Sequence, residues 1–134
     1  MSLLSYALLN NCLHLIACCP TININLAGDV KNIHSRSEGI YSYKGTINGR
    51  DYWVKVGGGD GALWYMGPDS KDWAIGKENS LGENRGYILS SSNLKSTCPT
   101  NSKNDWKYTN DGKWIPTNHV QLNCIGNHTI AFTT

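Results

Sequence analysis

The ionisable and nucleophilic side chains of this chain lack the spacing that enzymatic catalysis requires. A hydrolase needs a nucleophile with an adjacent base, or two carboxylates held at a defined separation. No serine lies in a Gly-x-Ser-x-Gly motif, and His34, His119 and His128 fall in different segments. Most aspartates stand in turn-like sequences, where Asp commonly bonds to the local backbone. We therefore assign no catalytic residue, and a small hydrolase or toxin is the least favoured function class.

Metal and cofactor motifs are missing from the same sequence. It contains no Cys-x-x-Cys, and its histidines are dispersed, so no zinc site is predicted. The glycine-rich residues 57–61 precede a strand-like segment rather than the helix that a phosphate-binding loop opens. Calcium is the one metal alternative, because four turn aspartates could converge at one end of a sandwich. These are Asp60, Asp69, Asp72 and Asp111.

Aromatic composition directs the functional search to binding surfaces. The chain has five Trp and seven Tyr but one Phe, and both enriched types join an apolar body to a polar group. Charged residues make up 16% of the chain, its net charge is +2, and Lys and Arg do not cluster. That pattern argues against nucleic-acid binding.

Several of these rings are candidate ligand contacts. Flat rings stack on sugar faces, while Asn, Asp and Arg orient polar groups of a ligand. In Tyr52-Trp53 and Trp64-Tyr65 the two neighbours must point to opposite faces of a strand, so one ring of each pair leaves the core. The candidate ligand-binding residues are Arg50, Asp51, Trp53, Trp64, Tyr65, Asn110 and Trp114. They favour a lectin-like module that binds a glycan or an extracellular protein; a self-assembling matrix or filament subunit is the alternative.

Two hairpins are expected to position these residues. Asn48-Gly49 and Asp111-Gly112 are dipeptides that accept the positive φ angles of tight hairpin turns, and aromatic residues flank both. Residues 22–26 alternate apolar and polar, as a half-buried strand does, whereas residues 31–38 are polar and predict a loop. Short strand-like segments recur up to residues 120–124, and residues 129–133 are a last strand or a tail. The sequence therefore predicts an all-β fold, a small antiparallel sandwich or barrel built from short hairpins.

The chain begins with an apolar segment distinct from the rest. Residues 1–19 carry no charged side chain and fit the apolar region of a secretory signal peptide, although no basic residue follows Met1. A buried first helix is one alternative, and a lipoprotein cleavage box at residues 15–18 is another. The segment is too short and too polar to span a membrane. We therefore expect one β domain over residues 20–134, with its core at about residues 21–124, in a secreted protein.

The number and positions of the cysteines also favour a secreted protein. The five are Cys12, Cys18, Cys19, Cys98 and Cys124, and removal of residues 1–19 leaves two that could form one bridge. One Asn-x-Ser/Thr sequon, at Asn127, is a candidate glycosylation site in a secreted chain.

The order of these motifs resembles a small extracellular module of secreted and cell-surface proteins in marine invertebrates and protists. The resemblance covers residues 21–124, and its motifs are Gly39-Ile-Tyr41, Asn48-Gly-Arg-Asp-Tyr52, Trp64-Tyr65, Trp73-Ala-Ile-Gly76, Cys98-Pro99, Trp106, Trp114 and Val120 to Cys124. It implies an extracellular all-β module with a Cys98–Cys124 disulfide. It implies no activity. This chain departs from the multidomain context of the module in being nearly a stand-alone domain.

Overall fold

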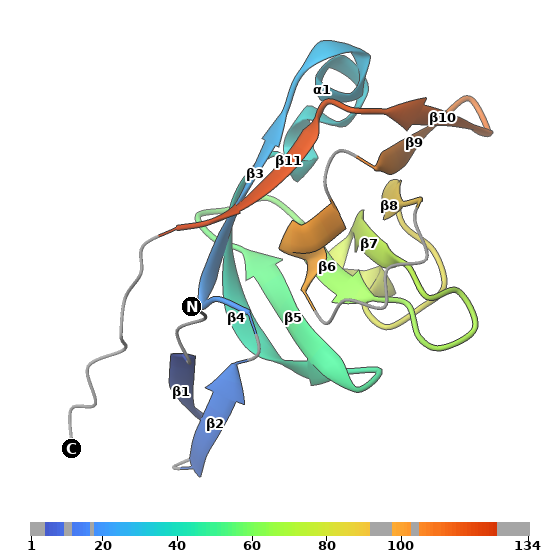
Figure 1. The fold of residues 1–134 in the computed structure, drawn as a ribbon. Coiled ribbons are helices and arrows are strands. Elements are labelled where there is room, and N and C mark those ends of the chain that lie inside the picture. The colour runs from blue at the N-terminus through green and yellow to red at the C-terminus, as the bar shows by residue number, and fades with distance from the viewer. Residues whose placement is uncertain (1–4, 10–11, 17, 92–97, 103–104, 126–134) are drawn as a thin grey trace.

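The computed structural model describes residues 5–9, 12–16, 18–91, 98–102 and 105–125. A nine-stranded antiparallel sheet dominates them, which confirms the predicted all-β fold (Figure 1). Its strand order is β10-β9-β8-β7-β6-β5-β4-β3-β11. The strands are β3 (Thr21–Leu26), β4 (Gly39–Ile47), β5 (Arg50–Lys55), β6 (Ala62–Tyr65), β7 (Trp73–Gly76), β8 (Ile88–Ser90), β9 (Trp106–Asn110), β10 (Lys113–Thr117) and β11 (Val120–Cys124).

The sheet curls into a half-barrel. Strands β3 to β10 follow one another as a meander, and β11 returns to pair with β3 on the far side. Only Asn118 and His119 connect β10 to β11, although these are the two outer strands of the sheet. Two residues span less than about 10 Å, so the curl must bring the two outer strands together at this end.

Both predicted hairpin turns are present. Asn48 and Gly49 have φ angles of 52° and 80°, and Asp111 and Gly112 have φ angles of 50° and 76°. Asn48 also ties its turn to the rest of the sheet, because its Nδ2 donates to the carbonyl of Tyr65 at 2.9 Å. The predicted strand or tail at residues 129–133 and the sequon at Asn127 lie outside the described residues.

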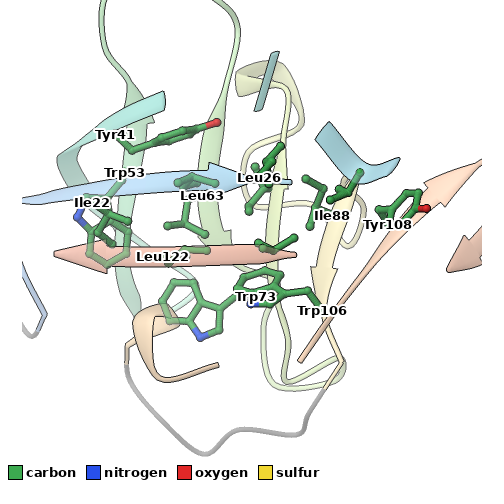
Figure 2. Close-up of a cluster of buried hydrophobic side chains, with 14 of the residues drawn as sticks. Ile22, Leu26, Tyr41, Trp53, Leu63, Trp73, Ile88, Trp106, Tyr108 and Leu122 are labelled. Carbon is green, nitrogen blue, oxygen red and sulfur yellow. The ribbon is translucent and has the colours of Figure 1, made fainter. Parts of the chain in front are cut away.

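One large core fills the concave face of the sheet (Figure 2). Each strand contributes alternate residues to it, as the period-two pattern of residues 22–26 predicted. Six rings belong to this core: Tyr41, Trp53, Tyr65, Trp73, Trp106 and Tyr108. Its fully buried aliphatic side chains include Ile22, Ile24, Leu63, Ile75 and Ile88.

A second, smaller core covers the convex face where β6 and β7 pair. All four residues of each strand are buried, so these strands are covered on both faces. Trp64 packs there with Ala62, Met66 and Ala74, and its indole nitrogen donates to the carbonyl of Glu83 at 3.0 Å. The polar segment after β7, which contains the 3-10 helix η2 (Glu78–Ser80), therefore folds back over this face.

A short helix replaces part of the loop predicted over residues 31–38. Helix α1 (Gly28–His34) is followed by the 3-10 helix η1 (Ser35–Ser37), and α1 lies beside the end of β3 and the start of β11 (Figure 1). Val30 is its buried residue and joins the main core. The prediction was wrong here because a helix of two turns with one buried side chain leaves no readable 3.6-residue period.

The apolar start of the chain forms strands rather than the alternative buried helix. Strand β1 (Ser5–Leu9) pairs with β2 (Cys12–Ile16) as a separate two-stranded antiparallel sheet. Figure 1 shows this pair apart from the nine-stranded sheet, below the start of β3. Among the described residues, no helix is long and apolar enough to cross a membrane.

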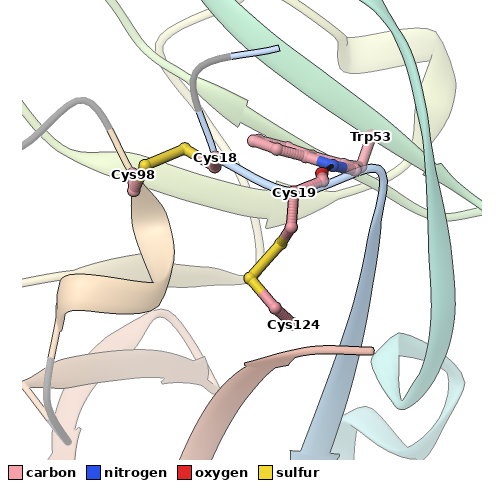
Figure 3. Close-up of a disulfide and its surroundings, with 5 residues drawn as sticks. All are labelled: Cys18, Cys19, Trp53, Cys98 and Cys124. Atoms are coloured by element: carbon pink, nitrogen blue, oxygen red, sulfur yellow. Dashed lines mark hydrogen bonds between the residues drawn. A yellow bond between two sulfur atoms is a disulfide. The ribbon is translucent and has the colours of Figure 1, made fainter. Parts of the chain in front are cut away.

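Two disulfides join adjacent cysteines to distant parts of the chain (Figure 3). The predicted Cys98–Cys124 bridge is therefore wrong. Cys18 pairs with Cys98 and Cys19 pairs with Cys124, with Cα–Cα distances of 5.5 and 5.9 Å. Neighbouring side chains in an extended segment point in opposite directions, so the adjacent cysteines reach two separate partners. The prediction removed residues 1–19 as a signal peptide before the cysteines were paired. Cys98 and Cys124 were then the two cysteines that remained, so they could pair only with each other.

These bridges also link the residues just before the predicted domain to it. Cys18 and Cys19 are bonded to Cys98 and Cys124, whereas the predicted domain begins at residue 20. A chain processed after residue 19 would lose both bridges, so a processed chain retains them only if cleavage precedes Cys18. The sulfur of Cys18 is engaged in a disulfide and cannot carry the thioether-linked lipid of the lipoprotein alternative.

Peptide mapping without reduction tests this connectivity. Cys18 and Cys19 lie on one tryptic peptide, and Cys98 and Cys124 lie on two others. We expect mass spectrometry to find all three peptides joined in one species. A species that joins only the peptides of Cys98 and Cys124 would contradict the structure.

Candidate functional site

Most of the predicted ligand-contacting tryptophans are closed to solvent. Trp53 and Trp64 are 0% exposed, and Trp73 and Trp106 are also buried. The indole nitrogen of Trp53 donates to the carbonyl of Cys19 at 2.8 Å, so its polar group is satisfied inside the protein (Figure 3). Neither the Trp53 ring nor the Trp64 ring, both predicted to contact a ligand, is open to solvent in this structure. Alternation does send Tyr52 and Trp53 to opposite faces, but the second core covers Tyr52.

The predicted polar partners at the first hairpin serve the fold. The guanidinium carbon of Arg50 lies 4.0 Å from the centroid of the Tyr65 ring, which is a cation–π contact. Tyr65 is 7% exposed and Asp51 is 6% exposed. None of these groups presents a ring or a carboxylate to solvent for ligand binding.

The second hairpin keeps one exposed ring. Trp114 is 44% exposed, and the Nζ atom of Lys107 lies 5.9 Å from its ring centroid. Trp114 is paired with Thr109, whereas Asn110 is paired with Lys113, so Trp114 and Asn110 point to opposite faces of the β-ribbon. The structure therefore brings Arg50 and Tyr65 together near the first hairpin, buries Trp53 and Trp64, and leaves Trp114 exposed on the β9–β10 ribbon.

Two of the four aspartates proposed for calcium accept hydrogen bonds within the fold. Asp60 Oδ1 accepts a hydrogen bond from the backbone N–H of Glu78 at 2.8 Å. Asp72 Oδ1 accepts from the hydroxyl of Ser90 at 3.1 Å. Burial raises the pKa of Asp72, and the Ser90 hydrogen bond opposes that shift. Within the described part of the chain, no three His, Cys, Asp or Glu side chains lie close enough to hold a metal ion.

A cleft beside α1 is the larger and more enclosed of the two clefts described here. Its volume is about 730 Å³. We call it the basic cleft; its lining residues are Ile33, His34, Ser35, Arg36, Ser37, Lys55, Gly59, Asp60, Lys77 and Tyr87. These come from α1, η1, the end of β5, the glycine-rich loop after it, and the residues that flank β7 and β8. The curl of the sheet brings these segments together beneath the short helix.

An aromatic pair forms one wall of the basic cleft. The His34 and Tyr87 rings are stacked, with centroids 5.5 Å apart and an interplanar angle of 18°. His34 Nε2 lies 2.7 Å from the carbonyl oxygen of Thr109, so the histidine donates this hydrogen bond and its ring is fixed. His34 also contacts Tyr108 edge-on, with centroids 6.1 Å apart. The wall is therefore rigid before any ligand arrives.

Hydrogen bonds join β4 and β5 to η1 beside the basic cleft. The hydroxyl of Tyr41 donates to the carbonyl of Ser37 at 2.7 Å, and burial raises the pKa of Tyr41 well above its usual value. The phenol therefore stays a neutral donor at ordinary pH. Gly61 lies against this hydroxyl, since a Cβ built there would stand 2.7 Å from it. Lys55 Nζ donates to the carbonyl of Arg36 at 2.7 Å and thereby joins β5 to η1.

A second cleft borders the N-terminal end of α1, with a volume of about 650 Å³. We call it the acidic cleft because it holds Asp29 and Asp105 and no Lys or Arg. Its lining residues are Gly28, Asp29, Val30, Asp105, Trp106, Tyr108, Ile115, Pro116, Thr117, Asn118 and His119. The two ends of α1 thus border clefts whose charged side chains differ in sign.

Comparisons with known proteins found no significant match to this chain. No family model matches the chain, and no curated protein or solved structure is significantly similar to it. The resemblance to a small extracellular module therefore stays a prediction from the motifs.

Sequence reasoning missed the basic cleft because its residues are far apart in the chain. Arg36, Lys55 and Lys77 look like scattered surface charges, and His34 has no sequence partner. The glycine-rich residues 57–61 were the one available signal. Gly57, Gly58 and Gly59 have positive φ angles, and the loop they form borders the cleft instead of cradling a phosphate at a helix.

Paired substitutions distinguish buried from exposed rings. Trp53→Ala removes a fully buried side chain, so we expect it to lower the free energy of unfolding by about 3–5 kcal/mol. Trp114→Ala should lower it by less than about 1 kcal/mol, because that ring is already half in water. Chemical denaturation followed by circular dichroism measures both. Equal losses for the two variants would contradict this account of the core.

Proposed function

We propose that this chain is a secreted, disulfide-bonded module that binds carbohydrate in the basic cleft. The observation that carries the proposal is the cleft itself: a pre-formed concave site in which a fixed aromatic wall faces several hydrogen-bond donors. Its volume of about 730 Å³ falls within the usual range for small-molecule sites. A ring that stacks on a sugar face, combined with donors for its hydroxyls, is the usual chemistry of glycan recognition.

Secretion is part of the same proposal. Structural disulfides persist in oxidising compartments, and two of them tie this chain together. In a secreted chain from a eukaryote, Asn127 is the candidate glycosylation site. Ligand binding is favoured over self-assembly because the outer strand β10 carries Lys113 and Pro116. A charge and a proline on an edge strand both oppose strand addition.

A glycan array with a cleft-filling variant tests the proposal. Ser35 is exposed and lines the cleft, so Ser35→Trp should fill the binding space while the core stays intact. We expect the wild-type protein to bind a set of glycans, Ser35→Trp to lose at least about tenfold in affinity for them, and Trp114→Ala to bind like the wild type.

Two outcomes would contradict the proposal. The first is an array without signal above background for the folded wild-type protein. The second is binding that survives in Ser35→Trp but is lost in Trp114→Ala, which would place the site on the β9–β10 ribbon.

A further inference from the structure

Three cationic side chains converge on the basic cleft from separate parts of the fold. Arg36 lies in η1, Lys55 ends β5, and Lys77 follows β7. Arg36 and Lys77 are exposed, and Lys55 is half-buried. Within the described part of the chain, none of the three forms a salt bridge with an Asp or Glu side chain, in contrast to Lys31 and Arg85, which pair with Glu38 and Glu83. The positive charge of the cleft is therefore not neutralised by ion pairing among these residues.

The single carboxylate of the cleft is already engaged. Asp60 Oδ1 accepts the backbone N–H of Glu78 at the start of η2, which fixes the glycine-rich loop against the segment after β7. Lys55 is held as well, because its ammonium donates to the carbonyl of Arg36. An ammonium has three donors, so Lys55 keeps two for another acceptor.

We propose that the basic cleft selects acidic glycans, with a sulfate or carboxylate group of the sugar seated among Arg36, Lys55 and Lys77. This inference rests on the proposed function and names its ligand class. Charge-assisted hydrogen bonds from guanidinium and ammonium groups to such anions are about twice as strong as neutral ones. Tyr87, stacked on His34, lies on the same cleft and supplies the apolar contact for the sugar ring.

The acidic cleft strengthens this assignment. It borders the same helix, has a similar volume and contains aromatic and apolar residues, but its charged side chains are Asp29 and Asp105. Carboxylates repel a sulfated or carboxylated sugar. An acidic glycan is therefore directed to the cleft that holds Arg36, Lys55 and Lys77.

Binding of dextran sulfate, polygalacturonate and neutral dextran to the full chain tests the inference. We expect the sulfated or the carboxylated polymer to bind and neutral dextran to bind at least about tenfold more weakly. Affinity should fall as salt rises, because the contacts are electrostatic. Arg36→Gln and Lys77→Gln should each weaken acidic-polymer binding about three- to tenfold, since each removes one charged donor.

Matched controls separate a specific site from general charge attraction. Lys113→Gln removes the same unit of charge from an exposed position on β10, and we expect it to bind like the wild type. Asp29→Asn, in the acidic cleft, should also leave binding unchanged. Thermal melting of each variant confirms that it is folded.

The outcomes distinguish this inference from the proposed function. Equal losses for Lys113→Gln and Lys77→Gln would overturn the inference, because binding would then follow net charge. Neutral glycans that bind as tightly as acidic ones and are lost in Ser35→Trp would overturn the inference and leave the proposed function standing. Absence of binding to every glycan and polymer would overturn both.

Discussion

Two disulfides that start from one point of the chain hold the curled sheet in shape. The half-barrel has nine strands, and Asn118 and His119 connect its outer strands β10 and β11. The adjacent residues Cys18 and Cys19 precede β3: Cys18 is bridged to Cys98, between β8 and β9, and Cys19 is bridged to Cys124 at the end of the neighbouring strand β11. In the chain-entropy model, a bridge across 80 residues contributes about 4–5 kcal/mol, mainly because it restricts the unfolded chain, and the second bridge adds less because its loop overlaps the first. Trp53 joins these bridges to the core, since its indole nitrogen bonds to the carbonyl of Cys19.

The candidate site depends on the curl of the sheet. Segments from separate strands line the basic and the acidic cleft, and these clefts border the C-terminal and the N-terminal end of the short helix α1. Each wall is fixed by contacts that also serve the fold, such as the Tyr41–Ser37 hydrogen bond and the stacked His34 and Tyr87 rings. A ligand would therefore meet a rigid surface and would not need to order it, which lowers the entropic cost of binding.

The sequence predicted the fold better than the site, for physical reasons. Period-two patterns and the Asn48-Gly49 and Asp111-Gly112 dipeptides are local signals, so strands and turns could be read directly. Burial is a property of the assembled sheet: Trp64 is an outward-facing residue that the segment after β7 covers, and no local pattern indicates that. Disulfide pairing is equally non-local, so counting cysteines after removing residues 1–19 could not find the partners of Cys98 and Cys124. The basic cleft depends on three charges more than fifteen residues apart, which only the curl brings together.

We place ligand binding in the basic cleft and not on the β9–β10 ribbon that carries Trp114. A titration of isotopically labelled protein with dextran sulfate, followed by two-dimensional NMR, distinguishes the two locations. We expect saturable shifts of the backbone amides of Arg36, Lys77 and Tyr87, while the indole N–H signal of Trp114 stays in place. Shifts centred on Trp114 and Lys107, with the cleft signals unmoved, would contradict this location of the site.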